Sequence, residues 1–317
     1  MFRLSPLLSL IAVAVAAHVA LGAARVTTSL YALSLQASEF TVGTLIALFA
    51  VFPMLLAVPM GRVIDRGGVR RPLMAGCVVA SLGVAVAATV KAIAALYVAA
   101  ILIGTGFMAI FIAAQHAVGT LAAPDQKAAG FSKLSVGFSV SAFLGPLIAG
   151  FTIDHVGHAA AFAACGAFTL LAFAIASGSA LRALPVQPAG NAQHKGSPLQ
   201  LLRDRELRGV YFVGILLAAA WDLFTFVTPI RGTQLGFSAS TIGMILASFS
   251  AATFAVRIAM PGIVRRFHEW QVLTGALCAA ALCYALLPFM QQPLAMAATA
   301  FALGLALGSG QPNVLAL

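Results

Sequence analysis

The sequence predicts an all-α polytopic membrane protein. Hydrophobic residues make up 62% of the 317 residues and charged residues only 8%, so a soluble fold could not cover its surface with charge. The apolar residues form long unbroken runs, whereas the strands of a membrane barrel would give short alternating segments. Helices satisfy their own backbone hydrogen bonds in lipid and are therefore the expected spanning elements. This composition excludes a disordered chain, a secreted disulfide scaffold and a nucleic-acid binder.

Ten apolar runs are long enough to cross a bilayer core of about 30 Å. They are expected at residues 5–31, 40–61, 72–92, 95–117, 129–153, 158–181, 208–230, 240–261, 271–290 and 293–317. The segment 182–207 is rich in Pro, Gly and polar residues, and it is the predicted cytoplasmic linker. It would join an N-terminal six-helix half (1–181) to a C-terminal half (208–317) that holds four helices.

The basic residues predict the orientation of the bundle. With the N-terminus in the cytoplasm, 14 Lys and Arg residues fall in cytoplasmic segments and only Lys91 and Arg231 fall in outside loops. This bias follows the positive-inside rule, so the net charge of +10 is a topology signal. Arg257, near the cytoplasmic end of the eighth span, is expected to snorkel toward the membrane surface. We expect a multi-pass protein of the bacterial inner (plasma) membrane.

A repeat with an offset of 200 residues relates two parts of the chain. LQASEFTVGTLIALF (35–49) aligns with LGFSASTIGMILASF (235–249), with six identities. The second span therefore corresponds to the eighth, which predicts a parallel repeat of two six-helix halves. The same offset places Leu317 opposite Ala117, so counterparts of the fifth and sixth spans are absent from the sequence. We expect a fragment or truncated product with ten of twelve spans.

The loop between the second and third spans reads GRVIDRGGVRRP (61–72). It resembles the signature loop of the major facilitator superfamily, and the resemblance implies a transporter bundle. The matching residues are Gly61, Asp65, Arg66, Gly68, Arg70 and Arg71. We interpret them as a conformational latch in which Asp65 caps a helix N-terminus or pairs with an arginine of a neighbouring helix. The alternative is that these arginines only fix topology.

The fifth span contains GFSVSAFLGPLIAG (137–150). It looks like the Gly-Pro motif of proton-coupled drug antiporters of that superfamily, although Ala149 stands where a paired glycine is common. The glycines would let a neighbouring helix approach closely, and the proline would remove a backbone hydrogen bond and bend the helix. The residues of this predicted helix bend are Gly137, Gly145, Pro146 and Gly150. Packing alone is the alternative.

Ionisable residues inside spans are functional candidates because their burial in lipid is costly. The first span places His18 and Arg25 on one face, which Thr28 extends. The seventh span holds Asp222, the only acidic residue well within a span. The 200-residue offset puts Asp222 opposite Gly22, at a depth similar to that of Arg25.

The family resemblance implies that the first, fourth, seventh and tenth spans line a central cavity. We expect Arg25 and Asp222 to face each other there, with Asp222 as the proton carrier, so that proton binding, substrate binding and ion pairing compete. A static salt bridge is the alternative. The predicted substrate-cavity residues are His18, Thr28, Trp221, Thr225, Gln311 and Asn313. The last two flank Pro312 in a polar stretch that predicts an interrupted helix.

These features predict a secondary active transporter that moves a small molecule by alternating access. The Gly-Pro span favours proton-coupled efflux of drugs or metabolites. The alternatives are proton-coupled uptake of a small organic anion, suggested by Arg25, and a non-transporting remnant or scaffold. The sequence shows no phosphate loop, metal-ligand spacing or Ser/His/Asp arrangement, so no enzyme activity, cofactor or metal is expected. The expected partners are a small-molecule substrate, protons and the lipid bilayer. We expect no binding of nucleic acid, and a monomer if the protein is full length.

Overall fold

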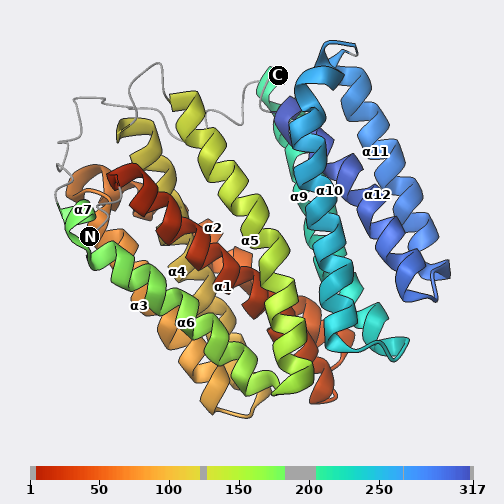
Figure 1. Cartoon of the computed structure of the whole chain (residues 1–317), viewed down its shortest axis with the longest axis horizontal. Coiled ribbons are helices and arrows are strands. Elements are labelled where there is room, and N and C mark those ends of the chain that lie inside the picture. Colours follow the sequence, from red (N-terminus) through yellow and green to blue (C-terminus); the bar gives the residue numbers. More distant parts are fainter. Residues whose placement is uncertain (1–4, 122–126, 183–204, 267, 315–317) are drawn as a thin grey trace.

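The computed structural model describes residues 5–121, 127–182, 205–266 and 268–314, and every regular element in them is a helix (Figure 1). The elements are α1 (Pro6–Ser34), α2 (Glu39–Gly67), α3 (Arg70–Thr89), α4 (Ile93–Leu121), α5 (Lys127–His155), α6 (His158–Ser177), α7 (Ser179–Arg182), α9 (Arg205–Gln234), α10 (Ala239–Val264), α11 (Glu269–Leu286), η1 (Leu287–Phe289) and α12 (Pro293–Val314). Ten of these helices are long and apolar enough to cross a membrane, which confirms the predicted fold class. Most of the predicted linker, residues 183–204, lies outside the described residues.

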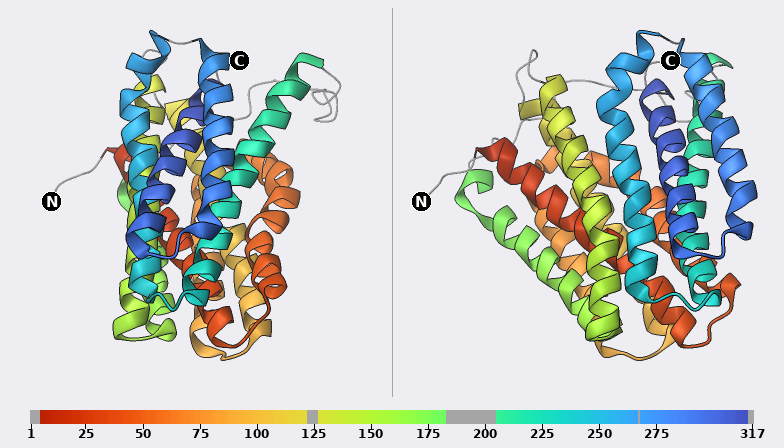
Figure 2. Two further views of the ribbon diagram at one scale, coloured as in Figure 1. Left: turned by 90° about the vertical axis from the view of Figure 1, so that its right-hand side faces the viewer. Right: turned by 45° about the vertical axis from the view of Figure 1, so that its right-hand side comes forward.

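The long helices pack in two groups. In the first group α1 packs against α4, α5 and α6, and α3 packs against α4 and α6. In the second group α12 packs against α10 and α11. The groups meet where α5 contacts α10 and where α9 contacts α1 and α2. Figures 1 and 2 show α5 and α10 closest at the lower end of the view and diverging toward the upper end.

The same turn leads into α2 and into α10, at an offset of 200 residues. The backbone of Gln36 has φ 59° and that of Gly236 has φ 73°, both in the left-handed region. Ser38 Oγ and Ser238 Oγ then each accept a 3.2 Å hydrogen bond from the backbone N–H three residues later. These serines cap the two helices in the same way. The repeat found in the sequence therefore extends to the backbone conformation.

Glycines of α5 allow α1 to lie close to it. The Cα hydrogen of Gly145 faces α1, and a Cβ there would lie 3.0 Å from the backbone nitrogen of Ala23. A Cβ at Gly137 would collide with the side chain of Val15. Small residues of this kind let membrane helices approach at backbone distance. This packing turns the Pro146 side of α5 toward the interface between the two groups.

A seam between α5 and α10 closes one end of that interface. We define the seam as Gly150 and Asp154 of α5 with Ala239, Ser240 and Gly243 of α10. A Cβ at Gly150 would meet the carbonyl oxygen of Ala239, so the two backbones touch here. The carboxylate of Asp154 accepts hydrogen bonds from the backbone N–H groups of Ala239 and Ser240, at 2.9 and 2.8 Å. The carboxylate thus satisfies two orphan donors at the N-terminus of α10.

Candidate functional site

A cavity of about 480 Å³ lies between the two helix groups. Its described lining comes from α1, α5, α9 and α10, with Phe111 added by α4. Of the four spans expected to line it, the first, fourth and seventh (α1, α4 and α9) do so. The fifth and eighth spans, α5 and α10, also supply much of the wall, which was not expected. The reason is the seam, which brings α5 and α10 to the interface. The described part of α12, the tenth span, contributes no lining residue.

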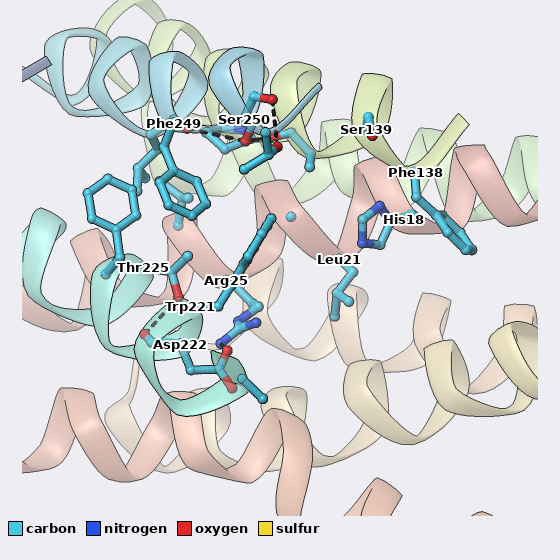
Figure 3. Close-up of a pocket in the computed structure, with 18 of the residues that line it drawn as sticks. His18, Leu21, Arg25, Phe138, Ser139, Trp221, Asp222, Thr225, Phe249 and Ser250 are labelled. Carbon is cyan, nitrogen blue, oxygen red and sulfur yellow. Dashed lines mark hydrogen bonds and ion pairs between the residues drawn. The ribbon is translucent and has the colours of Figure 1, made fainter. Parts of the chain in front are cut away.

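Arg25 of α1 and Asp222 of α9 meet at this cavity (Figure 3). The distance between Arg25 Nη2 and Asp222 Oδ1 is 2.7 Å, which is typical of a charge-assisted hydrogen bond. The Asp222 side chain is 50% exposed and the Arg25 side chain is 23% exposed, and both residues line the cavity. The pair joins the two helix groups. Its breakage would remove a direct polar contact between them.

Aromatic rings form the cavity wall beside this pair. Trp221 packs edge-on against Phe249, with ring centroids 4.7 Å apart, and Phe249 stacks on Phe224 at 4.5 Å. Thr225, also in the lining, donates its hydroxyl hydrogen to the Asp222 carbonyl oxygen at 2.9 Å. The predicted residues Trp221 and Thr225 therefore lie at the cavity, next to Asp222.

His18 lines the cavity at some distance from the ion pair. Seven residues separate His18 from Arg25, which corresponds to about 10 Å along α1. The imidazole ring lies between Phe107 and Phe138, with centroid distances of 5.3 and 4.9 Å. Its Nδ1 is buried and has no hydrogen-bond partner among the described residues. Figure 3 shows His18, Phe138 and Ser139 together at one end and Arg25 with Asp222 at the other.

Arg257 of α10 is a cavity residue, and the prediction that it snorkels to the membrane surface was wrong. Arg257 Nη1 donates to Ser139 Oγ at 2.9 Å and to Ser135 Oγ at 3.4 Å, both on α5. All three residues line the cavity. The guanidinium finds polar acceptors inside the bundle because the close approach of α5 and α10 brings two serines within its reach. The signal was in the sequence, since Ser135 and Ser139 are spaced i, i+4 on a span.

Thr28 is buried and is not among the cavity-lining residues, so its predicted place in the cavity was wrong. At 100° per residue Thr28 is rotated by about 80° from His18 around α1, which turns it out of the shared face.

The side chains of Gln311 and Asn313 lie outside the described residues. The backbone of α12 continues as a helix through Val314, so the predicted interruption is not present; bundles tolerate a proline such as Pro312 within a helix.

The signature loop differs from its prediction in the partner of Asp65. Helix α2 continues to Gly67, so Asp65 lies in its last turn, and its carboxylate is 3.5 Å from His116 Nδ1 of α4. Asp65 was expected to cap a helix N-terminus or to pair with an arginine. No side chain caps the N-terminus of α3 at Val69. The ion-pair partner of Asp65 in the described chain is His116. The helix ends only at Gly68, with φ 77°, because this is the first position that needs left-handed backbone.

The remaining predicted latch residues surround this helix end. Arg66 lies in the last turn of α2, Arg70 begins α3, and Arg71 is exposed. A Cβ at Gly61 would meet nothing within 4 Å, so packing does not require a glycine there. Within the described ranges no group of three or more His, Cys, Asp or Glu residues could hold a metal ion.

The described chain is thus a ten-span helical bundle with a cavity of charged, polar and aromatic side chains between two helix groups, an arrangement typical of membrane transporters. The chain belongs to the Major Facilitator Superfamily, whose family profile matches residues 8–317. It is 26% identical over 267 residues to the class C tetracycline resistance protein of Escherichia coli, and the match covers 78% of this chain and 63% of that protein. The chain thus matches less than two thirds of the length of this relative.

Two solved structures share the fold. The nucleoside transporter NupG (D323A mutant) has a TM-score of 0.80 at 10% identity, covering 98% of this chain and 81% of that one. A POT family transporter in complex with 5-aminolevulinic acid has a TM-score of 0.79 at 12% identity, covering 97% and 82%. At these identities the likeness is one of fold. The family and its relatives indicate a transporter rather than an enzyme.

Proposed function

We propose that this protein exports a small molecule by alternating access of the central cavity, in exchange for protons bound at Asp222. The observation that carries the proposal is the 2.7 Å contact between Arg25 and Asp222. It joins α1 to α9, and Asp222 is the one carboxylate in the described lining of the cavity. Protonation removes the negative charge and with it most of the attraction between Arg25 and Asp222, which is one of the contacts between the two helix groups.

Exchange requires that the substrate and the proton compete. Asp222 lines the cavity and its side chain is half-exposed, so a substrate group and a proton can both reach it. A substrate that binds the ionised carboxylate is released when a proton arrives, which is negative coupling between the two ligands. The class C tetracycline resistance protein supports the outward direction, as does Pro146 of the Gly-Pro motif in the cavity wall.

A second candidate is proton-coupled import of an organic anion. It is favoured by the exposure of Arg25 to the cavity, because a substrate carboxylate could displace Asp222 from Arg25. The released carboxylate would then take up a proton, and the substrate and the proton would bind together. The sign of the coupling therefore separates import from export.

The test uses Asp222→Asn, which keeps the shape of the side chain and removes its titratable group. Inside-out vesicles that contain the full chain are given an imposed pH gradient, and tetracycline is the labelled probe. We expect gradient-driven accumulation to fall at least about ten-fold, while exchange without a gradient persists. Lys91→Gln is the control, because it removes an exposed charge outside the cavity. Transport by Asp222→Asn that keeps its full dependence on the gradient would overturn the proposal.

A further inference from the structure

The ion pair in the cavity leaves most of its hydrogen-bonding capacity unused. Arg25 Nη2 donates to Asp222 Oδ1 at 2.7 Å, and within the described residues this is the one hydrogen bond of either charged group. A guanidinium carries five N–H donors, and an ionised carboxylate accepts at about four lone-pair sites. Arg25 Nε is buried and has no hydrogen-bond partner in the described part of the chain. Both groups therefore have donors and acceptors left for a ligand.

A ligand with a single charge would leave one member of this pair uncompensated. A cation that displaced Arg25 from Asp222 would leave the guanidinium alone, and an anion that displaced Asp222 would leave the carboxylate alone. An uncompensated charge inside the bundle is strongly unfavourable. The other charged residue of the described lining, Arg257, donates to Ser139 of α5 and is not part of this pair. A ligand that carries both charges binds both groups, so the pair favours a zwitterion.

The spacing of the two groups suits a ligand whose own charges are close together. When one carbon atom carries an ammonium and a carboxylate, standard bond lengths place the nitrogen and the nearer oxygen about 2.7 Å apart. The distance between Arg25 Nη2 and Asp222 Oδ1 is also 2.7 Å. A ligand of this kind, laid head to tail on the pair, brings its ammonium group to Asp222 and its carboxylate to Arg25. Each charge then has an opposite neighbour on the protein.

An aromatic side chain lies next to the pair. Trp221 precedes Asp222 on α9, and both line the cavity. The Trp221 ring packs edge-on against Phe249 of α10, with ring centroids 4.7 Å apart. Figure 3 shows Trp221 beside Arg25 and Asp222. An apolar group on the ligand can therefore pack against Trp221 while the charged groups reach the pair.

We propose that Arg25, Asp222 and Trp221 form a binding site for an amino-acid-like zwitterion with an apolar or aromatic side chain. The ammonium group binds Asp222, the carboxylate binds Arg25, and the side chain packs on Trp221. The cavity of about 480 Å³ holds a molecule of this size. This inference rests on the proposed function in taking the cavity as the substrate site, and it names the substrate class. It does not depend on proton coupling.

The test uses three probes that share one phenyl ring and differ in charge. L-phenylalanine is the zwitterion, phenethylamine the cation and 3-phenylpropionate the anion. Isothermal titration calorimetry on the purified full chain measures the Kd of each at neutral pH, without a proton gradient. We expect L-phenylalanine to bind at least about ten-fold more tightly than either other probe, because it makes one more charge-assisted contact. In the Trp270→Phe protein Trp221 is the only tryptophan, so a change in its emission places the phenyl ring beside it.

Two variants separate the two halves of the site. Asp222→Asn removes the partner of the ammonium group, so the Kd of L-phenylalanine should rise about ten-fold while that of 3-phenylpropionate does not rise. Arg25→Gln removes the partner of the carboxylate, so the Kd of L-phenylalanine should rise by a similar factor while that of phenethylamine does not. A general disturbance of the cavity would raise all three values together. The control is Lys91→Gln, which removes an exposed charge outside the cavity and should change none of them.

Three results would overturn the inference. They are no measurable binding of L-phenylalanine, binding of L-phenylalanine no tighter than that of a singly charged probe, and an equal rise of all three Kd values in Asp222→Asn. The comparison of the probes uses the parent protein, so it stands even where a cavity variant does not fold. Preference for the zwitterion with transport that does not need Asp222 would uphold this inference and contradict the proposed function. Equal affinities with transport that needs Asp222 would do the reverse.

Discussion

The two ends of the bundle hold their acidic residues in different ways. At the seam the carboxylate of Asp154 binds two backbone N–H groups of the other helix group, at 2.9 and 2.8 Å. Close by, Gln234 Nε2 donates to Glu39 Oε1 at 2.6 Å, again between the two groups. At the opposite end Asp65 lies 3.5 Å from His116, and both belong to the same group. The seam therefore holds the two groups together, whereas Asp65 acts within one of them.

This difference identifies the state that the structure represents. Alternating access needs two arrangements of the groups, each stabilised by contacts that the other lacks. The seam provides such contacts for the arrangement seen here, in which α5 and α10 diverge toward the signature-loop end (Figure 1). We therefore assign the seam to one state, and propose that the signature loop makes its contacts between groups in the other state.

The seam has no room for a side chain at Gly243. A Cβ at Gly243 would lie 2.5 Å from the carbonyl oxygen of Pro146, and a backbone oxygen cannot turn away. We expect Gly243→Leu to destabilise the closed seam by about 3 kcal/mol, through overpacking. Spin labels at two exposed positions of the two groups, 40 on α2 and 294 on α12, should then show a longer distance. Gly262→Leu is the control on the same helix, because a Cβ at Gly262 meets nothing within 4 Å. An unchanged distance in Gly243→Leu would show that the seam does not hold the groups together.

The contacts of Asp154 should matter less, because each is a single hydrogen bond at an exposed position. Asp154→Ala removes both bonds to the N-terminus of α10, and we expect a loss of about 1 kcal/mol of seam stability. Asp154→Asn keeps an acceptor oxygen and should lose about half as much. The same spin-label pair measures the population of the closed seam in each variant. Equal effects of Ala and Asn would mean that charge, rather than hydrogen bonding, dominates the contact.

The sequence predicted the helices well because apolar length and short connections decide them. Predicted ends were least accurate at α2, which was expected to stop near residue 61 and continues to Gly67. The charged residues Asp65 and Arg66 were interpreted as part of a loop. No residue before Gly68 prevents helical backbone, so α2 continues past them. Polarity marks where the membrane ends, and the backbone can continue past that point.

The site was predictable only where depth and the helix period suffice. The position of Asp222 relative to Arg25 followed from the 200-residue repeat, which places the two at one depth on related helices. The role of Arg257 required the rotation of α10 relative to α5, which depends on glycine contacts at the seam. The predicted cavity position of Thr28 was wrong for a similar reason, since a rotation of about 80° around α1 separates Thr28 from the face of His18. Which side of a helix points toward its neighbour is set by tertiary packing, and the sequence of one helix does not determine it.

The smallest effect is expected from Asp65→Asn. The Asp65 side chain is 53% exposed and its contact with His116 is 3.5 Å, so removal of the charge should cost less than about 0.5 kcal/mol in this state. The spin-label distance between positions 40 and 294 should stay as in the parent protein. If Asp65 belongs to a latch, its loss should lower the population of the other state, and transport should fall although the seam is intact. A seam that opens in Asp65→Asn would contradict the division of the two ends between two states, because it would show that the signature loop stabilises the same arrangement as Asp154.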